Sequence, residues 1–135
     1  MSQQTYIGLP VKDLAKATEF FTRLGFSYNP QASDERTACV VISDDTLVML
    51  NAEPYFKEFT QSEVADPSTA REVTLGLSAE SREQVDDLVE RVIAAGGQAL
   101  GGPVEQGPMY MRAFLDLDGH RWSLIHFEMP EQPGQ

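Results

Sequence analysis

One pattern occurs twice along this chain, and it constrains the fold more than any other feature. In each half, an apolar strand is followed by an amphipathic helix that ends in glycine, then by a short strand and a hairpin. The first copy spans residues 5–51 and the second spans residues 71–128, although the two share little residue identity. Two such βαβββ modules predict an α+β fold, with mixed sheets curved around a cleft and the helices outside. We therefore expect a single domain over residues 1–135.

Both predicted helices carry clear start and stop signals. Asp13 is a good N-cap for the first helix, and Gly25 supplies its left-handed end. The second helix opens with a capping box, in which Ser81 receives the Gln84 N–H and the Gln84 side chain reaches back. Gly96 ends this second helix. These signals place one helix in each module.

The modules are separated by a connection, residues 52–70. Within it, Pro54 can open a short helix that carries Tyr55, Phe56 and Phe59. A connection of this length is unusual in a compact domain and is typical of a linker or a lid. Two roles stay open for the aromatic residues: a small core that pins the connection, or a cover over the mouth of the cleft.

Charge and cysteine content exclude several classes of function. The chain has 21 Asp and Glu against 10 Lys and Arg, a net charge of -11. Such a balance argues against nucleic-acid and membrane partners, which need clustered basic residues, and it favours neutral or cationic ones. Cys39 is the single cysteine, so an intrachain disulfide and a multi-thiolate zinc site are excluded. We expect a cytoplasmic protein with Cys39 buried as a small hydrophobe.

Three segments resemble a known family. The run from Ile7 to Phe26 (IGLPVKDLAKATEFFTRLGF) is similar to the opening of the vicinal oxygen chelate superfamily, which includes glyoxalase I, bleomycin-resistance and fosfomycin-resistance proteins and extradiol dioxygenases. The run from Asp116 to Leu124 (DLDGHRWSL) resembles its final hairpin, and Ala94–Gly97 its second helix end. The chain looks most like bacterial proteins labelled predicted lactoylglutathione lyases. The resemblance implies the paired-module fold and a homodimer, with exposed residues of 6–11 or 109–114 at the contact.

The same resemblance implies four metal-ligand positions, normally His, Glu or Gln. They fall here at Tyr6, Met49, Thr74 and Ser123. A phenol, a thioether and two hydroxyls are poor ligands for a divalent ion. We therefore expect no metal and no other cofactor.

Strand alternation predicts which side chains line the cleft. The expected cleft face is largely apolar, with hydroxyls and two glycines: Tyr6, Gly8, Leu47, Met49, Thr74, Gly76, Ser123 and Ile125. Such a surface suits a small, partly apolar organic molecule. Arg112 shares a face with Tyr110 and either meets an anionic group of the ligand or pairs with a carboxylate. The predicted ligand-binding residues are Tyr6, Met49, Tyr55, Phe59, Thr74, Arg112 and Ser123.

Three functions stay open at this point. The first is metal-free binding of a small organic molecule. The second is a metal-dependent lyase or ring-cleaving dioxygenase, with ligands from His126, Glu128 or a partner chain. The third is a cofactor-free enzyme with Tyr6 as acid or His126 as base. Alternation puts His126 and Glu128 on the face opposite Ser123, where a terminal strand pair is the simpler interpretation, and His120 reads as a turn residue. Whether the protein is an enzyme stays open, and no catalytic residue is assigned.

Overall fold

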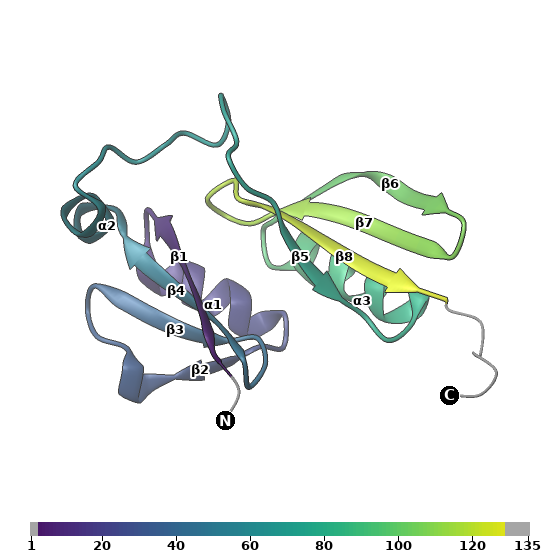
Figure 1. Cartoon of the computed structure of the whole chain (residues 1–135), viewed down its shortest axis with the longest axis horizontal. Helices are drawn as coiled ribbons and strands as arrows, with labels where there is room; N and C mark the ends of the chain where they lie inside the picture. The colour runs from purple at the N-terminus through teal and green to yellow at the C-terminus, as the bar shows by residue number, and fades with distance from the viewer. Residues whose placement is uncertain (1–2, 129–135) are drawn as a thin grey trace. The chain divides into compact units, whose positions relative to one another are not determined.

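The computed structural model describes residues 3–128, which form two compact units divided between Arg71 and Glu72 (Figure 1). Unit 1 contains β1 (Thr5–Val11), α1 (Leu14–Arg23), β2 (Ser27–Asn29), the short 3-10 helix η1 (Pro30–Ala32), β3 (Thr37–Val41), β4 (Thr46–Ala52) and α2 (Glu53–Thr60). Unit 2 contains β5 (Leu75–Ser78), α3 (Arg82–Ala94), β6 (Gln98–Gln106), β7 (Met109–Leu115) and β8 (Arg121–Phe127). The predicted α+β class is confirmed. No helix within residues 3–128 is long and apolar enough to cross a membrane.

Each unit is built on a four-stranded mixed sheet. The strand orders are β1-β4-β3-β2 and β5-β8-β7-β6, and in both the first pair is parallel while the others are antiparallel. In unit 1, α1 packs against β3 and β4, and in unit 2, α3 packs against β6, β7 and β8 (Figure 1). The helix therefore covers one face of its sheet, and alternation along each strand sends every second side chain to the other face.

The hydrophobic cores lie between each helix and its sheet. In unit 1, Phe20 and Phe21 of α1 are almost fully buried with Val48 and Leu50 of β4. In unit 2, the rings of Phe114 and Trp122 stack with centroids 6.2 Å apart, and Val85, Val89 and Val92 of α3 are fully buried. Burial of these side chains supplies the main stabilisation of each unit. The sheet faces turned away from α1 and α3 carry the residues of functional interest.

Two strands differ from the sequence prediction. The sequence of residues 72–77 (EVTLGL) predicts a strand from Glu72, but β5 begins at Leu75. Gly101, Gly102 and Pro103 are typical turn residues, but they lie inside β6, where the register with β7 shifts between Leu100 and Val104. The irregularity lies in an edge strand, and edge strands tolerate proline because its missing N–H leaves no ladder partner unpaired. Gly101 has φ +63°, a conformation that favours glycine.

The helix ends follow the predicted chemistry with one change. The Asp13 carboxylate accepts the Lys16 N–H at 3.0 Å, and the Ser81 hydroxyl accepts the Gln84 N–H at 3.0 Å. The Gln84 side chain reaches back to the N–H of Glu80 rather than to that of Ser81. The Ser81 bond therefore satisfies a donor that the first helical turn leaves unpaired, and the Gln84 bond satisfies the N–H of the residue before the N-cap.

We expect Ser81→Ala to lower the free energy of unfolding of unit 2 by about 1 kcal/mol, because the Gln84 N–H loses its acceptor. Ser81→Asp keeps an acceptor at the same position and is the control, with stability close to that of the parent. Urea unfolding followed by circular dichroism measures both. Equal losses in the two variants would contradict a capping role.

Candidate functional site

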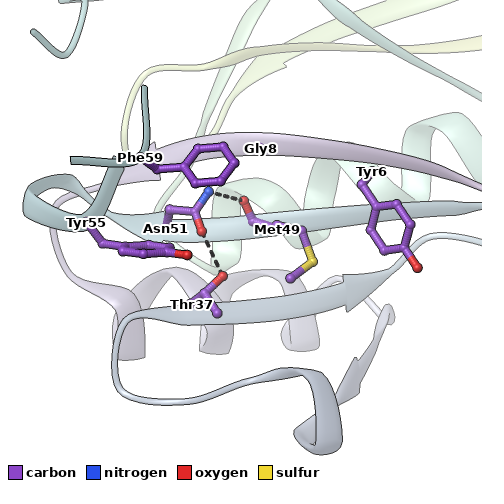
Figure 2. Close-up of a pocket in the computed structure, with 7 residues that line it drawn as sticks. All are labelled: Tyr6, Gly8, Thr37, Met49, Asn51, Tyr55 and Phe59. Atoms are coloured by element: carbon purple, nitrogen blue, oxygen red, sulfur yellow. Dashed lines mark hydrogen bonds between the residues drawn. The ribbon is translucent and has the colours of Figure 1, made fainter. Parts of the chain in front are cut away.

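A pocket of about 240 Å³ opens on the face of the unit 1 sheet that is turned away from α1 (Figure 2). It is lined by residues of three strands and of α2: Tyr6, Gly8, Thr37, Met49, Asn51, Tyr55 and Phe59. The parallel register sets Gly8 beside Met49, and the antiparallel register sets Thr37 beside Asn51. Each of these pairs therefore shares one face, as alternation requires.

Asn51 organises the polar part of the pocket. Its Oδ1 accepts a hydrogen bond from the Thr37 hydroxyl at 2.7 Å, and its Nδ2 donates to the Met49 carbonyl at 3.3 Å (Figure 2). The amide is buried and held in one orientation by these two bonds. Gly8 leaves room for it, since a Cβ at Gly8 would lie 3.3 Å from Asn51 Nδ2. An amide fixed in this way presents its second Nδ2 hydrogen as a directed polar contact inside a mostly apolar pocket.

Two aromatic rings of α2 line one end of the pocket, and Tyr6 lies at the other end (Figure 2). The rings of Tyr55 and Phe59 are 6.1 Å apart, and the Arg36 guanidinium lies 4.5 Å from the Tyr55 ring centroid. Phe59 is 72% exposed, and no residue of α2 is buried. Phe59 is therefore no part of a small aromatic core, while Tyr55 and Phe56 are half-buried where α2 contacts β1 and β4. The rings of Tyr55 and Phe59 border an open pocket.

The remaining predicted residues lie on unit 2. Thr74 immediately precedes β5, and Gly76 of β5 is in register with Ser123 of β8. Both hydroxyls accept a hydrogen bond from Nη1 of Arg121, at 2.9 Å for Thr74 Oγ1 and 3.1 Å for Ser123 Oγ. The structure thus brings Thr74 and Ser123 together around a guanidinium, on the sheet face turned away from α3.

The sequence profile of the Glyoxalase/Bleomycin resistance protein/Dioxygenase superfamily matches residues 3–124. The chain belongs to this superfamily. Among solved structures of the glyoxalase superfamily fold, a hypothetical protein from S. aureus, SA1046, is 30% identical with a TM-score of 0.81, over 93% of this chain and 94% of that one. Two further structures show the same fold. The fosfomycin resistance protein FosX from Listeria monocytogenes has 23% identity, a TM-score of 0.68 and 96% coverage of both chains. The bleomycin resistance determinant of transposon Tn5 has 22% identity and a TM-score of 0.66, over 95% of this chain and 100% of that one.

A search among curated proteins found no match. The finer resemblance to lactoylglutathione lyases stays a prediction.

The four positions at which the superfamily resemblance implies metal ligands do not fit a divalent ion. Tyr6 and Met49 offer a phenol and a thioether in unit 1, while Thr74 and Ser123 offer neutral hydroxyls in unit 2. Both hydroxyls already accept hydrogen bonds from the Arg121 cation. A metal ion bound to these hydroxyls would lie close to the guanidinium and be repelled by its positive charge. Within residues 3–128, no three His, Cys, Asp or Glu side chains are grouped to hold a metal.

Arg112 does not share the face of Ser123. It is in register with Leu124, on the face of β7 that α3 covers, and its Nη1 lies 3.3 Å from Asp86 Oδ1 of α3. The Arg112 side chain is only 16% exposed. The same carboxylate accepts the Tyr110 hydroxyl at 2.7 Å, and this hydrogen bond raises the pKa of the Tyr110 phenol. The prediction that Arg112 lies in the cleft is therefore wrong, and the alternative, that it pairs with a carboxylate, is what the structure shows.

The other titratable candidates have structural partners. His126 Nδ1 lies 3.0 Å from the Ala79 carbonyl oxygen, and the Glu128 carboxylate accepts from Arg82 Nε at 2.7 Å. Both lie on the helix-covered side of the sheet or at its end, as alternation predicted. His120 lies in the turn between β7 and β8, where its N–H donates to Asp116. Cys39 is buried, and burial raises the pKa of its thiol.

Three residues of these sites were absent from the prediction. Asn51 was missed because the β-rich run of the sequence (TLVML) predicts a strand only over residues 46–50, whereas β4 continues to Ala52. Thr37 joins the pocket through its register with Asn51, which only the folded sheet defines. Arg121 lies two residues before Ser123 on the same strand, so alternation alone places it on the same face as Ser123.

Proposed function

We propose that the chain binds a small, partly apolar organic molecule in the pocket of unit 1 without the help of a metal. The observation that carries the proposal is the composition of the lining: Met49, Tyr55 and Phe59 offer thioether and aromatic contacts around the oriented Asn51 amide. Rings and thioethers contact flat apolar groups well, and a single amide selects for a ligand with a hydrogen-bonding atom. A volume of about 240 Å³ fits a compact molecule rather than a large one.

The side chains at the four positions where the superfamily resemblance implies metal ligands support binding without a metal. Phenol, thioether and hydroxyl groups occupy all four, and a cation holds two of the hydroxyls. The names of two relatives, a bleomycin resistance determinant and a fosfomycin resistance protein, agree with a role that depends on a small molecule. The net charge of -11 favours a neutral or cationic ligand over an anionic one wherever no basic side chain lies nearby.

We expect a neutral aromatic probe, benzyl alcohol, to bind this pocket and Tyr55→Ala to weaken the binding about fivefold, because one wall of the pocket loses its ring. NMR of methyl-labelled methionine measures the binding: the Met49 methyl signal shifts with saturation, while those of Met109 and Met111 in unit 2 stay in place.

The control variant is Tyr28→Ala, which removes an exposed tyrosine of unit 1 that does not line the pocket and should bind as the parent does. The titration is repeated after exhaustive treatment with a chelator. Binding that disappears with the chelator and returns with added zinc, nickel, iron or manganese would contradict the metal-free proposal. A Met49 signal that never responds would contradict the binding site itself.

We also propose that the protein is a homodimer, as the superfamily resemblance implies. Tyr6, in the segment 6–11 expected at the contact, is 62% exposed and therefore accessible to a second copy of the chain. Light scattering coupled to size exclusion, over a range of protein concentrations, distinguishes a dimer from a monomer.

A further inference from the structure

The Arg121 guanidinium of unit 2 is held by neutral groups alone. Its Nη1 donates to Thr74 Oγ1 at 2.9 Å and to Ser123 Oγ at 3.1 Å, and the Thr74 hydroxyl donates in turn to the Arg121 carbonyl at 3.4 Å. Ser123 is 5% exposed, so its hydroxyl is a fixed part of the sheet rather than a mobile surface group. These bonds hold the guanidinium in place without neutralising its charge.

Arg121 differs in this respect from other arginines of unit 2. Arg82, Arg91 and Arg112 each form an ion pair with a carboxylate. Among residues 3–128, no carboxylate lies within ion-pair distance of Arg121, although the chain carries 21 acidic residues. A guanidinium has five N–H donors, and within the described part of the chain only Nη1 has acceptors. The Nε and Nη2 donors therefore form a free edge of the planar group.

The neighbours of Arg121 on this face of the sheet are mostly apolar. The register places Leu115 opposite Arg121 and both Ala113 and Gly76 beside Ser123, and Ile125 follows on the same face of β8, turned away from α3. Gly76 has no side chain, and a Cβ there would lie 3.5 Å from Ile125 Cδ1, so the Ile125 side chain borders the space above this glycine. A planar guanidinium binds a carboxylate through two parallel hydrogen bonds, and an apolar floor beside it accepts the body of the same ligand.

We propose that this face of unit 2 binds an organic carboxylate, with Arg121 as the ionic anchor and with Thr74 and Ser123 as its positioning residues. All the residues of this site belong to unit 2, and it shares no residue with the pocket proposed for unit 1. It also gives a strongly acidic protein one place where an anionic group is attracted rather than repelled.

The test titrates benzoate and, separately, its neutral analogue benzamide into protein labelled at alanine, isoleucine and methionine methyl groups, at a concentration where all variants share one oligomeric state. Benzoate is expected to shift the Ala113 and Ile125 signals with saturation and to bind about tenfold more tightly than benzamide. Arg121→Gln should weaken benzoate about tenfold. The matched control Arg91→Gln removes the same charge from α3 and should bind benzoate as the parent does.

The positioning role has its own readout. Thr74→Val removes one acceptor of the guanidinium and should weaken benzoate about threefold, whereas Thr74→Ser keeps the hydroxyl and should restore parental affinity. Equal affinity for benzoate and benzamide, or equal losses in Arg121→Gln and Arg91→Gln, would overturn the proposal. If benzoate shifted only the Met49 methyl signal, the proposal for unit 2 would be overturned, while the proposed pocket of unit 1 would be unaffected. Loss of benzyl alcohol binding with intact benzoate binding would refute only the pocket.

Discussion

Replacing Asp116 with alanine is expected to lower the free energy of unfolding of unit 2 by about 3 kcal/mol, because three donors lose their acceptor at once. The carboxylate is buried in the turn between β7 and β8. It accepts the Trp122 indole N–H at 3.0 Å and the backbone N–H groups of Asp118 at 2.9 Å and His120 at 3.0 Å. Trp122 is 1% exposed, so water cannot take over its N–H in the folded state.

Urea unfolding measures this loss through the fluorescence of Trp122, the single tryptophan of the chain, and independently through circular dichroism. Asp118→Ala is the matched control, since Asp118 lies in the same turn and contributes only its backbone N–H to this network. A loss below about 1 kcal/mol in Asp116→Ala would show that the turn survives without its carboxylate.

The pH dependence of the same residue is expected to have a definite sign. Burial raises the pKa of the Asp116 carboxyl above its ordinary value of 3.8, and this effect outweighs the lowering by the His120 charge and by the bond from Trp122. The folded state therefore binds this proton more tightly than the unfolded state. The resulting stabilisation is complete below pH 3.8 and is lost as pH rises through the folded-state pKa.

Asp116→Asn carries no such proton, so it isolates this contribution from those of the other acidic groups. The difference in the free energy of unfolding, parent minus Asp116→Asn, should decline as the pH is raised from 3.8 toward neutrality. A difference that grows with pH would show that hydrogen bonding to the carboxylate dominates burial.

Much of the fold was predictable because its signals are local. Asp13 and Ser81 form their caps with backbone groups three residues away, and Gly25 and Gly96 end their helices with φ of +106° and +100°. The irregularity of β6 was not predictable in this way. Glycine and proline normally interrupt a strand. Here β6 continues past Gly101 because the residues on both sides of the irregularity pair with β7, and this pairing cannot be read from the local sequence.

The candidate sites were predictable to the extent that alternation decides them. Alternation placed Met49 correctly on the face turned away from α1 and paired Arg112 with Tyr110 on one face of β7. Which face of β7 meets α3 depends on the register with β8, and this register sends Arg112 to Asp86. The bond between Arg121 and Thr74 joins residues 47 positions apart, so no local pattern contains it.

Two phenylalanines of unit 1 should respond in opposite ways to the same substitution. Phe20→Ala is expected to lower the free energy of unfolding of unit 1 by about 4 kcal/mol, because it empties a site in the core. Phe20 is 1% exposed, and its ring lies 5.0 Å from that of Phe21 in an edge-to-face contact. Phe59→Ala removes a largely exposed ring and should change stability by less than about 0.5 kcal/mol.

For benzyl alcohol binding, Phe59→Ala is the variant in which a specific loss is expected. Phe59 borders the pocket, so Phe59→Ala should weaken benzyl alcohol about fivefold in a unit that remains fully folded. Hydrogen exchange of the β4 amides reports the global stability of unit 1, which contains no tryptophan, and the Met49 methyl signal reports binding. Parental exchange rates in Phe20→Ala would contradict the assigned core. If Phe59→Ala bound benzyl alcohol with the affinity of the parent, Phe59 would not contribute to the binding site. The ligand would then be held by the strand residues around Asn51.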